Sequence, residues 1–182
     1  DKLHSELNGS LFRYDKCDLT DADEVKTLHQ KMRQKNYLPD AVILNAALDL
    51  EDEYPKLSIS SGAAMMRTNV EGAFVWVSAF IEPFLERGSG QFIAIASLFS
   101  HWPDRSCVAY SASKAAVSML FRGLRIRYPN QIRFKLVYLG LVDTPINPRF
   151  AENPIDKKSF IVASPEDTAQ YISKAIVSRK QN

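Results

Sequence analysis

The sequence of 182 residues predicts an α/β fold, in which helices pack on a doubly wound parallel sheet. Short apolar runs of strand type alternate along the chain with longer segments of helical periodicity, and this alternation is typical of βαβ units. The chain shows no internal repeat, and its 46% apolar residues can form a substantial core. Its length favours a single domain over residues 1–182.

The first third of the chain predicts strand, helix and strand in turn. Apolar and polar residues alternate over Leu11–Tyr14, which suits a short strand. Asp18–Asp21 then offers helix N-caps, apolar residues recur at helical spacing as far as Met32, and Pro39 ends that helix. The continuous apolar run Ala41–Leu44 predicts a buried parallel strand with both faces covered.

The middle of the chain predicts two long helices around a buried strand. A helical stretch runs from about Ser60 to Glu86, and Gly88–Gly90 ends it. Phe92–Ala96 has the continuous apolar character of a buried strand. A second helix is expected over Val108–Arg127, closed by Pro129.

The last part of the chain predicts a strand, a loop and a final helix. Ile132–Leu139 is a core-type strand, although branched and charged residues are mixed in it. Asp143–Lys158 contains three prolines and predicts an irregular loop. Ser164 is an N-cap for the last helix, which carries proline and acidic residues in its first turn.

Composition argues against several classes of function. The 23 basic and 21 acidic residues give a formal net charge of +2, so no nucleic-acid partner is expected. Cys17 and Cys107 form no metal motif with any histidine and suggest no disulfide framework. No apolar stretch is long enough to cross a bilayer and no signal peptide is visible, so we expect no membrane association and a cytoplasmic location.

The segment Tyr110-Ser111-Ala112-Ser113-Lys114 predicts acid–base chemistry. Residues four apart on a helix lie side by side, so an ammonium would lie next to a phenol. A tyrosine has an ordinary pKa of about 10, and a neighbouring positive charge favours the phenolate and lowers that pKa toward the working range. An exposed surface pair remains the alternative for this spacing taken alone.

Other polar residues occupy positions where ligands bind in open α/β sheets. Ser97 directly follows the strand Phe92–Ala96, Asn45-Ala46-Ala47 follows Ala41–Leu44, and Asp18-Leu19 comes just after the first strand. Asn69 lies within the long helix. Structural alternatives stay open, because a serine after a strand often caps a helix and a helical asparagine often bonds only backbone.

Taken together, these residues resemble the short-chain dehydrogenase/reductase family. The resemblance depends on Asp18, Asn45-Ala46-Ala47, Asn69, Ser97 and Tyr110-x-x-x-Lys114 in this order and at these separations. Leu139–Thr144 is similar to the family's segment after the sixth strand, and the resemblance covers nearly the whole chain. It implies a Rossmann-like sheet in three α/β/α layers, and an oxidoreductase that transfers a hydride between nicotinamide and a carbonyl or secondary alcohol.

The resemblance also implies a role for each site residue. Tyr110 would be the general acid–base, and Lys114 would lower its pKa and bind the nicotinamide ribose. Ser97 would hydrogen-bond the substrate oxygen, and Asn69 would hold a water of a proton relay. Contacts to the NAD or NADP cofactor are implied for Asp18, Leu19, Asn45, Ala46, Ala47, Tyr110, Lys114, Gly140, Val142 and Thr144.

The sequence departs from the family pattern in three ways. Leu139 stands where the family usually has proline, and Ala47 stands where glycine is usual. No Gly-x-x-x-Gly-x-Gly turn is present. We therefore expect a partial, N-terminally truncated fold that lacks the family's first two strands and its last one. Leu11–Tyr14 and Ala41–Leu44 would then have unpaired edges, and residues 1–182 alone would be inactive, with an empty dinucleotide site.

Two functions remain open at this stage. The first is the oxidoreductase, and the second is a truncated non-catalytic relative that serves as an interaction or structural module. Apolar and aromatic residues after Ser97, such as Phe99, His101 and Trp102, suggest a hydrophobic ketone or alcohol as substrate. The family resemblance also implies a homodimer or homotetramer through the two long helices, because the apolar residues Phe74, Trp76, Val77, Phe80 and Phe84 exceed what one face can bury.

Overall fold

The computed structural model describes residues 15–50, 56–105, 107–144 and 162–178. The strand predicted for Leu11–Tyr14 and most of the loop predicted for Asp143–Lys158 lie outside the described residues. The remaining predicted helices and strands are all present.

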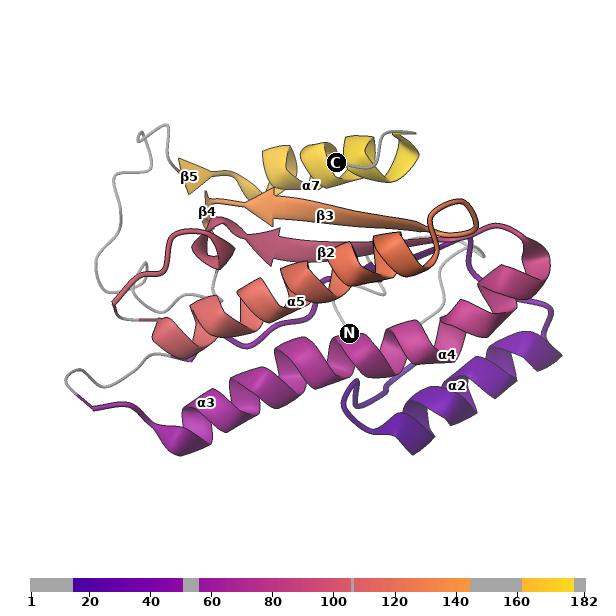
Figure 1. Ribbon diagram of the computed structural model, residues 1–182, viewed down its shortest axis with the longest axis horizontal. Helices are drawn as coiled ribbons and strands as arrows, with labels where there is room; N and C mark the ends of the chain where they lie inside the picture. The colour runs from indigo at the N-terminus through magenta and orange to yellow at the C-terminus, as the bar shows by residue number, and fades with distance from the viewer. Residues whose placement is uncertain (1–14, 51–55, 106, 145–161, 179–182) are drawn as a thin grey trace.

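A three-stranded parallel sheet forms the centre of the fold (Figure 1). Its strands are β1 (Ala41–Leu44), β2 (Gln91–Ser97) and β3 (Arg133–Leu139), in the order β1-β2-β3. A second, two-stranded parallel sheet joins β4 (Leu141–Val142) to β5 (Val162–Ala163) beyond the carboxyl end of β3.

Helices cover both faces of the main sheet, which makes three layers (Figure 1). One face carries α2 (Ala22–Gln34), α4 (Gly72–Arg87) and α5 (Val108–Arg127). The other face carries α7 (Pro165–Val177), which Ser164 caps through its side chain. The predicted fold class, a partial Rossmann-like α/β/α arrangement, is confirmed.

Alternation along β2 divides the core into two layers. Phe92, Ala94 and Ala96 face α4 and α5, where they meet Phe80, Phe84, Phe121 and Phe134. Ile93 and Ile95 face α7 together with Val137. Every residue of β2 is buried, and between the polar ends Gln91 and Ser97 the strand is entirely apolar, as expected for a parallel strand covered on both sides.

The prediction that Ala41–Leu44 is covered on both faces is wrong. Val42 packs into the core at 7% exposure, but Ile43 is 44% exposed. The helix on the face of Ile43 is α7, and it packs against β2 and β3 and leaves this side chain open. Among the described residues, β1 pairs with β2 and with no strand on its other edge.

The long helix predicted from Ser60 to Glu86 has the expected extent but changes its winding midway. It begins as α3 (Ile59–Met65), capped by Ser58, widens to a π-helix η1 (Met66–Glu71), and continues as α4. Gly88 ends it with a left-handed φ of 69°. A π-helical turn often marks a functional position, and this one contains Asn69.

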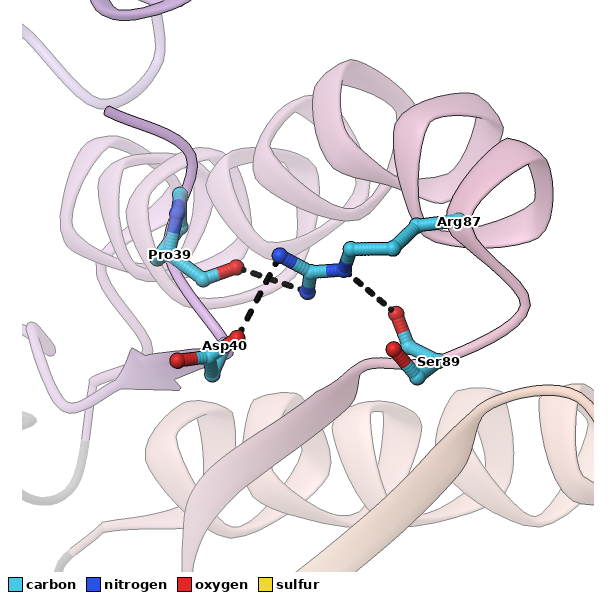
Figure 2. A network of polar contacts seen from close by, with 4 residues as sticks. All are labelled: Pro39, Asp40, Arg87 and Ser89. Carbon is cyan, nitrogen blue, oxygen red and sulfur yellow. Dashed lines mark hydrogen bonds and ion pairs between the residues drawn. The ribbon is translucent and has the colours of Figure 1, made fainter. Parts of the chain in front are cut away.

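Arg87 ties the end of α4 to the start of β1 (Figure 2). Its Nε donates to Ser89 O at 3.1 Å, and its Nη2 donates to Pro39 O at 3.0 Å. Its Nη1 lies 3.3 Å from the Asp40 carboxylate, which is fully exposed. The guanidinium therefore holds the start of β1 mainly through the Pro39 carbonyl, because an exposed ion pair adds little.

The described part of the chain contains neither a candidate membrane span nor a candidate metal cluster. No helix in it has the length and apolar character needed to cross a membrane. Among the same residues, no group of three or more His, Cys, Asp or Glu could hold a metal ion.

Candidate active site

The carboxyl ends of the strands surround a cavity of about 330 Å³. This is the edge of the sheet where ligands bind in open α/β folds. Most of the residues predicted from the sequence line this cavity, namely Asn45, Ala47, Ser97, Tyr110, Lys114, Gly140, Val142 and Thr144. The fold thus brings together residues that are almost one hundred positions apart in the sequence.

Ser97 is the last residue of β2 and is nearly buried. Its Oγ accepts a hydrogen bond from Phe99 N at 3.2 Å and caps the short 3₁₀-helix η2 (Leu98–Ser100). The same hydroxyl is hydrogen-bonded to the side chain of Tyr110. Ser97 can therefore cap η2 and also serve the proposed site, because one hydroxyl makes both contacts.

Tyr110 and Lys114 lie one turn apart near the start of α5. Lys114 is only 5% exposed, its Nζ lies 5.6 Å from the centre of the Tyr110 ring, and it donates to Ile95 O at 2.9 Å. The alternative of an exposed surface pair is therefore wrong. A lysine is rarely buried in this way without a specific partner.

The structure contradicts the expectation that Lys114 gives Tyr110 a low pKa. The pKa of Tyr110 is raised to about 12, mainly by burial and also by the negative charge of Asp49, while the hydrogen bond with Ser97 opposes both. Burial also lowers the pKa of Lys114 to about 8, while Asp49 opposes that change. Removal from water disfavours phenolate and ammonium alike, and for both side chains it is the largest cause of the pKa shift.

Asn69 connects the π-helix to two other parts of the site. Its Oδ1 accepts from Leu48 N at 2.7 Å, and its Nδ2 donates to Leu48 O at 2.9 Å. The same Nδ2 donates to Ser113 Oγ at 2.9 Å, and Ser113 in turn bonds Tyr110 O at 2.7 Å. Asn69 therefore holds the loop after β1 against the helix that carries Tyr110.

A second cavity of about 440 Å³ lies between β1, α2 and α4. Its mainly apolar lining includes the predicted residues Leu19 and Ala46, and Asn45, Asn69 and Lys114 also border it. Asp18 lines neither cavity. Its Oδ1 accepts from Thr20 N at 2.9 Å and from Thr20 Oγ1 at 2.8 Å, and these bonds lower the pKa of the carboxyl.

The predicted aromatic lining is only partly present. Phe99 lines the smaller cavity. His101 instead packs on Tyr138, with ring centres 4.7 Å apart, and Trp102 is 69% exposed. Asp49, a carboxylate in the lining of the same cavity, was not predicted from the sequence. Its place four residues after Asn45, in the loop that follows a strand, was the signal that could have identified it.

Comparison with known proteins agrees with this geometry. The family model described as short chain dehydrogenase matches residues 1–154. The chain belongs to this family. An uncharacterized oxidoreductase of Staphylococcus saprophyticus is 30% identical to it over 131 residues, which cover 71% of this chain and 56% of that protein. Another, from Staphylococcus aureus strain USA300, is 29% identical over 164 residues, which cover 90% of this chain and 69% of that protein.

A solved structure of the family shares the same fold. An alcohol dehydrogenase from the archaeon Thermococcus sibiricus, complexed with 5-hydroxy-NADP, superposes with a TM-score of 0.76. The two chains are 23% identical, and the match covers 90% of this chain and 67% of the archaeal one. The chain thus spans 56% to 69% of the length of these relatives.

Proposed function

We propose that this chain carries the catalytic residues of an NAD(P)-dependent oxidoreductase that acts on a carbonyl or a secondary alcohol. The observation that carries the proposal is the meeting of Ser97, Tyr110 and Lys114 around one cavity, with Asn69 bonded to the elements that hold them. A hydroxyl, a phenol and an ammonium at the carboxyl ends of parallel strands suit proton transfer to an oxygen atom.

The donors at the cavity fit the nicotinamide end of NAD or NADP. The Lys114 ammonium can hydrogen-bond ribose hydroxyls, and Gly140, Val142 and Thr144 line the wall where a carboxamide would lie. For the adenosine side we propose contacts with Asp18, Leu19, Asn45, Ala46 and Ala47. When bound, the cofactor supplies the hydride chemistry, and the protein supplies position and proton transfer.

Each polar residue of the site would have a separate role in proton transfer. Ser97 would hydrogen-bond the substrate oxygen and stabilise the charge that develops there. Tyr110 would donate its proton to that oxygen in reduction and accept it in oxidation. A pKa of about 12 keeps the Tyr110 hydroxyl protonated near neutral pH, as proton donation requires. Asn69 and Lys114 would lead the replacement proton in from solvent.

Replacement of Tyr110 tests this proposal. Tyr110→Phe removes the proton donor and keeps the ring, so the turnover number of the intact protein should fall by about 10²-fold or more while its stability stays nearly unchanged. Turnover can be followed by NAD(P)H absorbance across a panel of ketones and secondary alcohols. Near-normal turnover in Tyr110→Phe would contradict the assignment.

The second candidate, a non-catalytic interaction module, has weaker support. A chain that had lost catalysis would be expected to lose at least one of Asn69, Ser97, Tyr110 and Lys114, and all four are present. We therefore favour the enzyme, and we keep a small-molecule substrate and a cytoplasmic location as predictions.

We also propose that the chain self-associates through its long helices, as a homodimer or homotetramer. The surplus of apolar residues is smaller than the sequence suggests, because Val77, Phe80 and Phe84 are buried in the core and Trp76 stacks on Phe80. Phe74 on α4 remains 51% exposed, and Met119 and Ile126 on α5 are 62% and 83% exposed. Large apolar side chains that remain open on neighbouring helices favour contact with a partner.

A further inference from the structure

Asp49 is an acidic residue of the catalytic cavity to which the reaction outlined above assigns no role. It follows β1 in the loop that begins at Asn45, and it is half-buried. It lines the same 330 Å³ cavity as Ser97, Tyr110 and Lys114. A carboxylate in such a place is costly unless the surrounding charges compensate it.

The chain holds Asp49 in place from both sides. The preceding residue, Leu48, makes hydrogen bonds with the Asn69 side chain through both its N–H and its C=O. The following residue, Leu50, donates its N–H to Met65 Sδ at 3.4 Å. Since Asn69 and Met65 lie on one continuous long helix, the backbone on each side of Asp49 is tied to that helix. The backbone at Asp49 is therefore held in place at the wall of the cavity.

The negative charge of Asp49 shifts the pKa of two reactive groups of the cavity in the same direction. Asp49 favours the ammonium form of Lys114 and disfavours the phenolate form of Tyr110, so it raises the pKa of both. Among the described residues that line this cavity, the titratable side chains are Asp49, Tyr110 and Lys114. Behind Tyr110, Cys107 acts on it in the same direction. The neighbouring groups from β2 and η1, namely Ser97, Ile95 O and Asn69, are uncharged.

We propose that Asp49 is a positioning residue of this site, a counter-charge to Lys114 that sets the pH range over which Tyr110 donates a proton to the substrate. This inference deepens the proposed function and rests on it for the part that concerns Tyr110. The charge pairing itself depends only on Asp49 and Lys114, so the two can be tested separately.

The charge pairing has a measurable consequence in the protein without substrate. Burial places the pKa of Lys114 at about 8, within reach of titration, and Asp49 keeps it from falling lower. In Asp49→Asn the carboxylate is replaced by a neutral amide of the same shape. The titration midpoint of Lys114 should then fall by about half a pH unit or more. The midpoint can be followed by NMR of ¹³C-labelled lysine side chains in the intact protein, with Lys114→Arg to assign the signal.

The catalytic consequence is a shift of the pH–rate profile. Both pKa values fall when the charge of Asp49 is removed, so the alkaline limb of ketone reduction should move to lower pH. Acetophenone with NADPH is a suitable first probe, because the cavity is largely apolar and contains Phe99. Asp49→Glu retains the charge and should keep the profile close to that of the unmodified protein.

Asp23→Asn serves as the matched control. Asp23 is an exposed carboxylate in the first turn of α2 and lines neither cavity, so its replacement should change neither the Lys114 midpoint nor the profile. An unchanged Lys114 midpoint in Asp49→Asn would overturn the proposal, whether or not turnover is found. A shifted midpoint supports the charge pairing even in a protein with no turnover, and that lack of turnover would count against the proposed function alone.

Discussion

Replacing Asn69 with alanine removes the connection between the π-helix, the loop after β1 and the helix α5. The side chain makes three hydrogen bonds of 2.7–2.9 Å, two with Leu48 backbone groups and one with Ser113 Oγ. Asn69 is 5% exposed and Ser113 is fully buried. Leu48 is half-buried, so water has only partial access to its backbone groups when they lose their partner.

The expected loss of stability follows from these contacts. A typical hydrogen bond contributes about 1 kcal/mol net, and a buried group left without a partner costs about 1–3 kcal/mol. Ser113 keeps its bond to Tyr110 O, so the main loss falls on the N–H and C=O of Leu48. We expect Asn69→Ala to lower the free energy of unfolding by about 3 kcal/mol.

Urea unfolding measures the total effect, and amide hydrogen exchange at Leu48 measures the local one. The Leu48 amide should exchange faster in Asn69→Ala, because its N–H donates to the side chain that is removed. Asn130→Ala is the control: Asn130 is an exposed turn residue, and its change should stay within about 0.5 kcal/mol. A loss below about 1 kcal/mol in Asn69→Ala, with unchanged exchange at Leu48, would refute the reasoning.

Two further predictions concern pH and association. The pKa of Lys114 is 10.5 in an unfolded chain and about 8 in the folded one. Between these pH values the unfolded chain binds one proton more than the folded chain. The contribution of Lys114 to the free energy of unfolding therefore increases as pH rises through this range. Lys114→Leu should remove that rise, and urea midpoints across this range would show it; the same rise in both proteins would contradict the prediction. Sedimentation of the intact protein should show a dimer or a larger species. Phe74→Asp should weaken this association, and the control Asp23→Asn should leave it unchanged. A strict monomer at high concentration would count against association.

Local chemistry in the sequence was sufficient to predict most of the described fold. Continuous apolar runs identified the strands β1 and β2, and a run of mostly branched and aromatic residues identified β3 despite its two charged residues. Ser164 and Gly88 marked helix ends, because caps act within one turn. The position of Ser97 after a strand and the four-residue spacing of Tyr110 and Lys114 were likewise readable, since both depend only on local geometry.

The environment of each group was decided by the tertiary structure. Ile43 remains exposed although its strand is apolar, because α7 packs over β2 and β3. The sequence of β1 does not show where α7 packs. The spacing of Tyr110 and Lys114 predicts that they are neighbours, but the sign of the Tyr110 pKa shift depends on burial, and burial raises it to about 12. Asp49 acquires its place through hydrogen bonds between Asn69 and Leu48, which are 21 residues apart. Long-range contacts of this kind depend on how the helices pack on the sheet, and no local pattern encodes them.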